Sequence, residues 1–238
     1  MSLHHKTCNK PHALRQKTLE IHGGSTPYDT SLRPSLARVV AFPLKSFERG
    51  DSSRSYRLDI HNHWGTHVDA PAHFFRNGHR VSSYPADFWR FTSPQVLNVR
   101  LGPGQLLSRR HLEGNIKKKA DLVLIQSGWW KKRGRSEYCL KNPGVDAETG
   151  FWLRKHCPRV RAIGFDWVSL SSYLRREEGR AAHRAFLDPL GEGSAILILE
   201  DMDLSGRLEN LKEVWALPLR VEELDSAPCT VVGKFTDR

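Results

Sequence analysis

The sequence predicts an α/β domain with a mixed sheet and a few covering helices, and three observations lead to that class. Eight short runs rich in β-branched residues are typical of strands. Three helical segments lie among them, so strands outnumber helices and the two kinds of element mix along the chain. The 238 residues, 39% of them hydrophobic, provide enough apolar material for the core of one large domain.

The expected strands are short apolar runs bounded by polar or turn residues, and we expect them to be buried. In chain order they cover residues 38–42, 56–60, 95–99, 121–125, 162–165, 195–199, 214–217 and 229–232.

The expected helices begin after residues that can cap them. Ser108 can cap a helix that runs through about residue 119, and Asp146 can cap one that runs through residue 155. In the second helix, residues 151–153 (Phe, Trp and Leu) are expected to face inward. A third, shorter helix is expected over residues 179–187.

The amino-terminal residues, the lengths of the apolar runs and the cysteines indicate the domain organisation and the cellular location. Residues 1–17 are basic and polar and lack the apolar stretch of a signal peptide, so we expect a flexible tail followed by a single domain over 18–238. No apolar run is long enough to cross a bilayer. The four cysteines form no C-x-x-C pair, which favours a reducing, cytoplasmic location.

The formal charge of +11 raises the alternative of a basic nucleic-acid binder. The positive residues are dispersed, however, as short runs at 109–110, 117–119, 131–133 and 175–176, and no nucleic-acid motif accompanies them. We therefore expect neither a nucleic acid nor a membrane as partner. The charge can assist an anionic substrate or solubility.

Residues 61–73 hold the most informative pattern of the chain. His61, His63, His67, Asp69 and His73 all occupy odd positions. In an extended chain successive side chains alternate between faces, so all five would point the same way, whereas a helix would scatter them. Imidazole nitrogen and carboxylate oxygen are ligands for a borderline divalent metal, so the pattern predicts a metal site.

This segment must bend to gather its ligands. Residues 63–73, fully extended, would span on the order of 33 Å, too far for one ion. Gly65 and Pro71 can supply the turns, and both also argue against a helix. The alternative is a histidine-rich surface loop, since the chain has 12 histidines.

Two residues elsewhere are candidates for completing the site. His183 lies in an otherwise apolar helical stretch, and Glu200 ends an expected buried strand, where a carboxylate is costly unless it is paired or metal-bound. His183 can equally be a core histidine satisfied by hydrogen bonds, and Glu200 a surface charge at a strand end. Asp166 follows another strand and can support the ligands from behind or cap a turn.

The segment from His63 to His73 resembles the His-x-Gly-Thr-His-x-Asp-x-Pro-x-His signature of the cyclase family, which contains bacterial kynurenine formamidases and isatin hydrolases. The resemblance extends over roughly residues 56–235, with further matches at 121–129, 163–169, 183–187, 198–200, 215–219 and 225–228. The chain departs from the formamidases in two ways. The 16 residues between His183 and Glu200 are a longer stretch than expected for them, and a Trp-Pro-Gly-Asp-type stretch near the amino terminus is lacking.

The resemblance implies a swivelling β/β/α fold assembled into homodimers or homotetramers. It implies one or two divalent ions per chain, zinc as in the formamidases or manganese as in the isatin hydrolases. His63, His67 and Asp69 would bind the first ion, and Asp69 would bridge to a second ion held by His183 and Glu200. His73, in contrast, would be the catalytic acid/base.

The expected function is a metal-dependent hydrolase of C–N amide bonds that acts on a small-molecule amide. A bound divalent ion lowers the pKa of its water to about 7, and a histidine can move the proton toward the leaving nitrogen. Trp64, Phe74 and Trp129 can line an aromatic substrate pocket or simply pack in the core. An arylformamidase is the leading expectation. The alternatives are an isatin-type or other cyclic amide hydrolase and a non-catalytic metal- or ligand-binding protein on the same scaffold.

Overall fold

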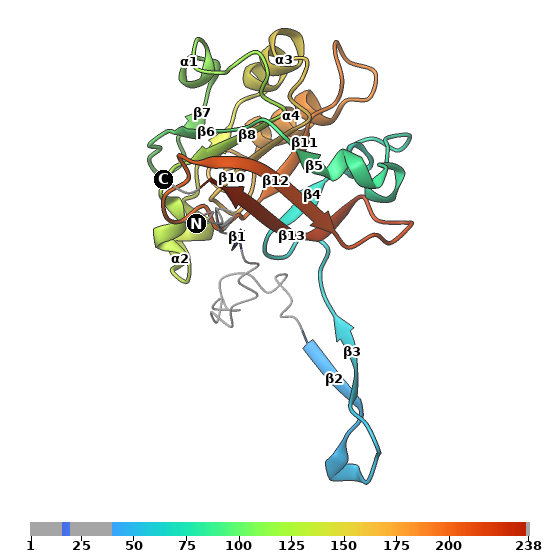
Figure 1. Cartoon of the computed structure of the whole chain (residues 1–238). Coiled ribbons are helices and arrows are strands. Elements are labelled where there is room, and N and C mark those ends of the chain that lie inside the picture. Colours follow the sequence, from blue (N-terminus) through green and yellow to red (C-terminus); the bar gives the residue numbers. More distant parts are fainter. Residues whose placement is uncertain (1–15, 20–39, 237–238) are drawn as a thin grey trace, which may run out of the picture.

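A mixed nine-stranded sheet forms the centre of the structure, a computed structural model that describes residues 16–19 and 40–236 (Figure 1). Its strands are β1 (Gln16–Leu19), β4 (His67–Asp69), β5 (Arg90–Phe91), β6 (Pro94–Asn98), β8 (Leu122–Gln126), β10 (Ala162–Phe165), β11 (Leu197–Glu200), β12 (Leu211–Pro218) and β13 (Ser226–Phe235). The order is β5-β12-β13-β4-β11-β10-β8-β6, with β1 paired to β13. The predicted mixed α/β class is confirmed.

The sheet has a parallel half and an antiparallel half, and they meet at β4. Strands β6, β8, β10 and β11 are parallel to one another. Strand β4 is antiparallel to β11 on one side and to the start of β13 on the other. The beginning of β4 therefore lies beside the carboxyl end of β11, at the edge where open α/β sheets place their ligands.

Side chains from the two faces of the parallel strands enter different cores. Val123, Ile163 and Ile198 pack in a cluster with residues of the helices, whereas Leu122 and Leu199 pack in a second cluster with residues of β12 and β13. This division follows from the alternation of side chains along each strand. Strands buried on both faces have nearly continuous apolar runs, as these do.

The α-helices are α1 (Arg109–Leu112), α2 (Ser136–Leu140), α3 (Ala147–His156) and α4 (Arg176–Leu187). The Asp146 carboxylate caps α3 by accepting a hydrogen bond from the Thr149 N–H at 2.8 Å, as predicted. Phe151, however, is 60% exposed, so the prediction that it faces inward was wrong. The predicted helix from 108 to 119 stops at Leu112 because the chain soon reaches Gly114 at φ +77°, the left-handed region in which helices end.

Shorter elements complete the chain. Strands β7 (Leu106–Leu107) and β9 (Gly144–Val145) pair in a small sheet of their own. The single-turn 3-10 helices are η1 (Phe47–Arg49), η2 (Pro71–His73), η3 (Val81–Ser83), η4 (Ala86–Trp89) and η5 (Trp129–Lys132).

A two-stranded arm projects from the body, formed by β2 (Val40–Lys45) and β3 (Ser55–Asp59) (Figure 1). The described parts of the predicted segments 38–42 and 56–60 lie mainly in these strands, but the prediction that they are buried was wrong. Phe42 and Leu58 are 38% and 63% exposed. Within the described residues these two strands pair only with each other.

Most of the predicted tail over residues 1–17 lies outside the described residues. Its last two residues belong to β1, which pairs antiparallel with β13. Among the described residues no helix is long and apolar enough to span a membrane.

Candidate metal centre

The register between β4 and β11 brings two polar side chains together. His67 lies opposite Glu200, and their Nε2 and Oε2 atoms are 3.2 Å apart. Because side chains alternate along β4, Asp69 lies on the same face as His67, and the His67 Nε2 is 3.6 Å from Asp69 Oδ1. The backbone N–H of Leu170 donates to Glu200 Oε1 at 2.6 Å and fixes the carboxylate from the other side.

Two histidines direct their Nε2 atoms into this group. The Nδ1 atom of His67 is 2.8 Å from the Gly65 carbonyl, and that of His183 on α4 is 2.8 Å from the Gly179 carbonyl. A carbonyl only accepts, so in each ring Nδ1 carries the proton and Nε2 is left as a ligand atom. The His183 Nε2 lies 3.6 Å from Glu200 Oε1 and 3.8 Å from Asp69 Oδ2.

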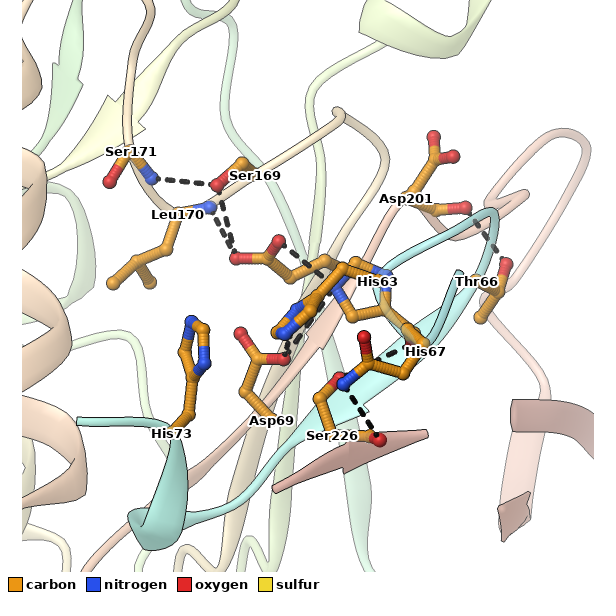
Figure 2. Close-up of polar contacts among 12 residues, drawn as sticks. His63, Thr66, His67, Asp69, His73, Ser169, Leu170, Ser171, Asp201 and Ser226 are labelled. Carbon is orange, nitrogen blue, oxygen red and sulfur yellow. Dashed lines mark hydrogen bonds and ion pairs between the residues drawn. The ribbon is translucent and has the colours of Figure 1, made fainter. Parts of the chain in front are cut away.

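His63 and His73 lie beside the same group, as Figure 2 shows, and their side chains are 23% and 25% exposed. The His63 Nδ1 is 3.1 Å from Asp69 Oδ1, and the His63 and His73 rings are 4.3 Å apart. The bends expected at Gly65 and Pro71 are both present, since Gly65 has φ +64° and Pro71 begins η2, which carries His73. The bent segment therefore returns His73 to the vicinity of His63.

The geometry leaves buried ligand atoms without hydrogen-bond donors. In the described part of the chain, His67 Nε2 and both Asp69 carboxylate oxygens receive no hydrogen bond. Two groups of residues each bring three possible ligand atoms within 4.8 Å of one another. One group is His63, Asp69 and His73, and the other is His67, Asp69 and Glu200. A divalent cation satisfies such atoms together, so the residues fit a metal centre in which Asp69 is shared.

The motif implied one ion at His63, His67 and Asp69 and a second at Asp69, His183 and Glu200. In the structure His63 and His67 both approach Asp69 Oδ1, and His183 approaches Asp69 Oδ2 and Glu200 Oε1. His67 also lies beside Glu200, and His63 lies beside His73. The roles of these residues as ligands or catalyst stay predictions.

The pKa shifts of His63 and Glu200 reflect the close contact between histidines and carboxylates in this group. Burial disfavours the charged form of His63, but its contacts with Asp225 and Asp69 outweigh burial and raise its pKa to about 10. Burial likewise opposes ionisation of Glu200, yet the neighbouring His183 and His67 hold its pKa well below the usual range. Without a cation, protons on the histidines balance these carboxylates, and a metal ion would replace those protons.

Asp225 is a functional candidate that the sequence reasoning missed. It directly precedes β13, and its Oδ2 is 2.7 Å from His73 Nδ1 and 3.6 Å from His63 Nε2. The Asn62 amide donates to its other oxygen at 2.9 Å. The contacts with His63 and His73 hold the pKa of Asp225 well below its usual range. Two signals were available: Asp225 lies just before an expected strand, and it begins the stretch 225–228 that resembles the cyclase family. Neither indicated a contact with His73, 152 residues away.

The other predicted residues take different positions. The Phe74 ring stacks on His183 at 4.7 Å and 12°, beside the centre, and Trp64 is half-buried in the loop before β4. Trp129, in contrast, is 3% exposed and packs in the core. The Asp166 carboxylate accepts hydrogen bonds from the backbone N–H groups of Ser127 and Gly128. It therefore fixes the turn after β8 and does not support one of the candidate metal ligands.

The sequence and the fold are both similar to those of known proteins. It is 25% identical to cyclase-like protein 1 of Arabidopsis thaliana over 88% of this chain and 85% of that protein. It is 28% identical to a kynurenine formamidase of Bacillus thuringiensis, with 79% and 84% covered. The fold matches isatin hydrolase A of Labrenzia aggregata with a TM-score of 0.68 at 20% identity, covering 84% of each chain.

The model of the Cyclase family matches residues 11–172, more than half of the sequence and the whole of the histidine segment. The chain therefore belongs to the cyclase family.

Proposed function

We propose that the protein is a metal-dependent hydrolase of C–N amide bonds, most simply an arylformamidase that converts N-formylkynurenine to kynurenine and formate. The observation that carries the proposal is the set of buried His67 and Asp69 ligand atoms without donors. They lie beside Glu200 and His183 and open to solvent through His63 and His73, whose side chains are 23% and 25% exposed. The kynurenine formamidases among its relatives support the substrate class.

The residues that would hold the metal are His67, Asp69 and Glu200 with His183, and His63 on the solvent side. Zinc, or alternatively manganese, suits this set of imidazoles and carboxylates, with one or two ions per chain. When bound, such an ion supplies Lewis acidity toward a carbonyl and a water molecule.

His73 is the proposed proton carrier. Asp225 accepts the hydrogen bond of its Nδ1–H, which leaves Nε2 free to take a proton from the attacking water. The same atom then delivers the proton to the leaving nitrogen, so the ring ends the cycle as it began. An Asp-oriented histidine of this kind keeps one tautomer and one ring orientation throughout.

Phe74 and Trp64 are the proposed aromatic contacts of the substrate. Phe74 follows His73 directly, and its ring lies 4.9 Å from the His73 ring. An aryl group packed there would bring its formamide toward the proton carrier. Trp129 is not part of this proposal because its side chain packs in the core.

Turnover by zinc- or manganese-loaded protein tests the proposal, with N-formylkynurenine as substrate and isatin as the cyclic alternative. We expect His73→Gln to lose most turnover and to keep its metal. His79→Gln, at an exposed histidine six residues further along the chain, should behave as wild type. Loss of metal in His73→Gln would make His73 a ligand. Metal binding without turnover of any amide would leave a non-catalytic binding protein.

We further propose that the protein is a homodimer or homotetramer and that the β2–β3 arm takes part in the contact. Five large apolar side chains on the two strands are exposed: Val40, Phe42, Leu44, Tyr56 and Leu58. By the pairing register Val40 and Phe42 lie on one face of the ribbon and Leu58 on the other, so both faces expose apolar side chains. A lone two-stranded ribbon is marginally stable, and apolar surface exposed in this way marks an interface. Leu58→Ser should lower the mass measured by light scattering. Leu190→Ser, a matched exposed leucine in the loop after α4, should not.

A further inference from the structure

Asp201 has an unusual backbone directly beside the candidate metal centre. It follows Glu200, the last residue of β11, and it is the only described non-glycine residue with a positive φ, at +55°. It is also buried, with 5% exposure. L residues adopt this conformation at a cost, so surrounding contacts must hold the turn.

A half-buried cation, Arg133, holds this turn. The Arg133 Nη1 donates to Asp201 Oδ2 at 3.1 Å, and its Nη2 donates to the Asp201 carbonyl at 3.0 Å. The Tyr138 hydroxyl donates to Asp201 Oδ1. Arg133 thus grips both the side chain and the main chain of Asp201, which only a planar guanidinium fork can do with fixed geometry.

The same carbonyl connects the turn to β4. The Thr66 hydroxyl donates to the Asp201 carbonyl at 2.8 Å, and Thr66 directly precedes His67 (Figure 2). The network therefore fixes the residue after Glu200 and the residue before His67. His67 and Glu200 themselves face each other, with Nε2 and Oε2 3.2 Å apart.

The geometry points to Arg133 as a positioning residue for the ligands His67 and Glu200, acting through Asp201. The inference rests on the proposed metal centre. His63 and His73 are instead held by Asp225, so Arg133 acts on the side of the centre formed by β4 and β11. Its charge also neutralises the Asp201 carboxylate next to Glu200.

Calorimetric titration of metal-free protein with Zn²⁺ tests this role. We expect Arg133→Met to weaken the binding event that Glu200→Gln also weakens, by at least about tenfold, and to leave any second event unchanged. The double variant should lose no more than Glu200→Gln alone, because both changes act on the same side of the centre. The visible spectrum of bound Co²⁺ should shift in Arg133→Met as it does in Glu200→Gln.

Two further variants keep the test decisive. Arg135→Met, at an exposed neighbouring arginine, is the matched control and should titrate as wild type. Tyr138→Phe removes one hydrogen bond to Asp201 and keeps the ring, so it should weaken the same event less; it replaces Arg133→Met if that variant fails to fold. A wild-type Zn²⁺ isotherm and Co²⁺ spectrum in the substituted proteins would overturn the inference, as would equal weakening of both events. Wild-type protein that binds neither Zn²⁺ nor Mn²⁺ would instead refute the proposed function.

Discussion

The pair formed by Asp225 and His73 allows a quantitative prediction for Asp225→Asn, which keeps the shape of the side chain and removes its charge. The hydrogen bond from His73 Nδ1 is 2.7 Å long, and the two side chains are 33% and 25% exposed. A hydrogen bond to a charged group contributes about 1.5–3 kcal/mol, and the solvent exposure favours the lower end. About 1.5 kcal/mol corresponds to roughly a tenfold loss in kcat. The asparagine amide can also turn its NH₂ toward Nδ1 and favour the wrong tautomer, which would deepen the loss.

The assay is the steady-state rate of N-formylkynurenine hydrolysis by metal-loaded protein, with metal content measured on the same samples. We expect kcat to fall and KM to change little, and no additional loss when Asp225→Asn is combined with His73→Gln. Glu223→Gln, at an exposed carboxylate in the same loop, is the control. Wild-type kcat in Asp225→Asn would refute the orienting role. A parallel loss of metal would show that Asp225 acts through His63.

Three other predictions concern stability. When the free metal concentration is about 1,000 times the Kd, chelation should lower the free energy of unfolding by about 4 kcal/mol and the Tm by about 10 °C. An unchanged Tm in thermal unfolding would argue against a bound ion. Burial raises the pKa of the Cys229 thiol to about 12. The unfolded thiol ionises from about pH 8.5, so the folded state binds more protons and stability falls as pH rises between these values. Cys229→Ala should therefore lose about 2 kcal/mol less than wild type between pH 8 and pH 10 in urea unfolding, and equal slopes would refute this. In Gly78→Ala the new Cβ would lie 2.4 Å from the Pro71 carbonyl carbon and 2.6 Å from the Ala72 nitrogen. It should lower stability by about 1–3 kcal/mol and reduce turnover, unlike Gly102→Ala, whose Cβ meets its nearest neighbour at 3.5 Å.

Local patterns predicted much of the fold because they report local geometry. The apolar runs located the parallel strands β6, β8, β10 and β11, and Asp146 marked the start of α3. The same kind of pattern failed where the outcome depended on the environment. The strands of the arm have strand composition, but composition does not say whether another element covers them. Likewise an aromatic residue such as Trp129 can line a pocket or pack in the core, and the tertiary structure places it in the core.

The sequence by itself determined the chemistry of the candidate centre. Spacing by two placed His67 and Asp69 on one face, and Gly65 and Pro71 provided the bends that gather the histidines. Those features are local, and the period of an extended chain suffices to derive them.

Only the tertiary structure decided which groups face each other. The pairing of His67 with Glu200 depends on the register of β4 against β11, and the contact of His73 with Asp225 depends on where β13 begins. Contacts between distant segments follow from the packing of the whole sheet, which no local period encodes. The sequence therefore identified the candidate ligands, and the fold determined how they are grouped and which carboxylate contacts His73, the proposed proton carrier.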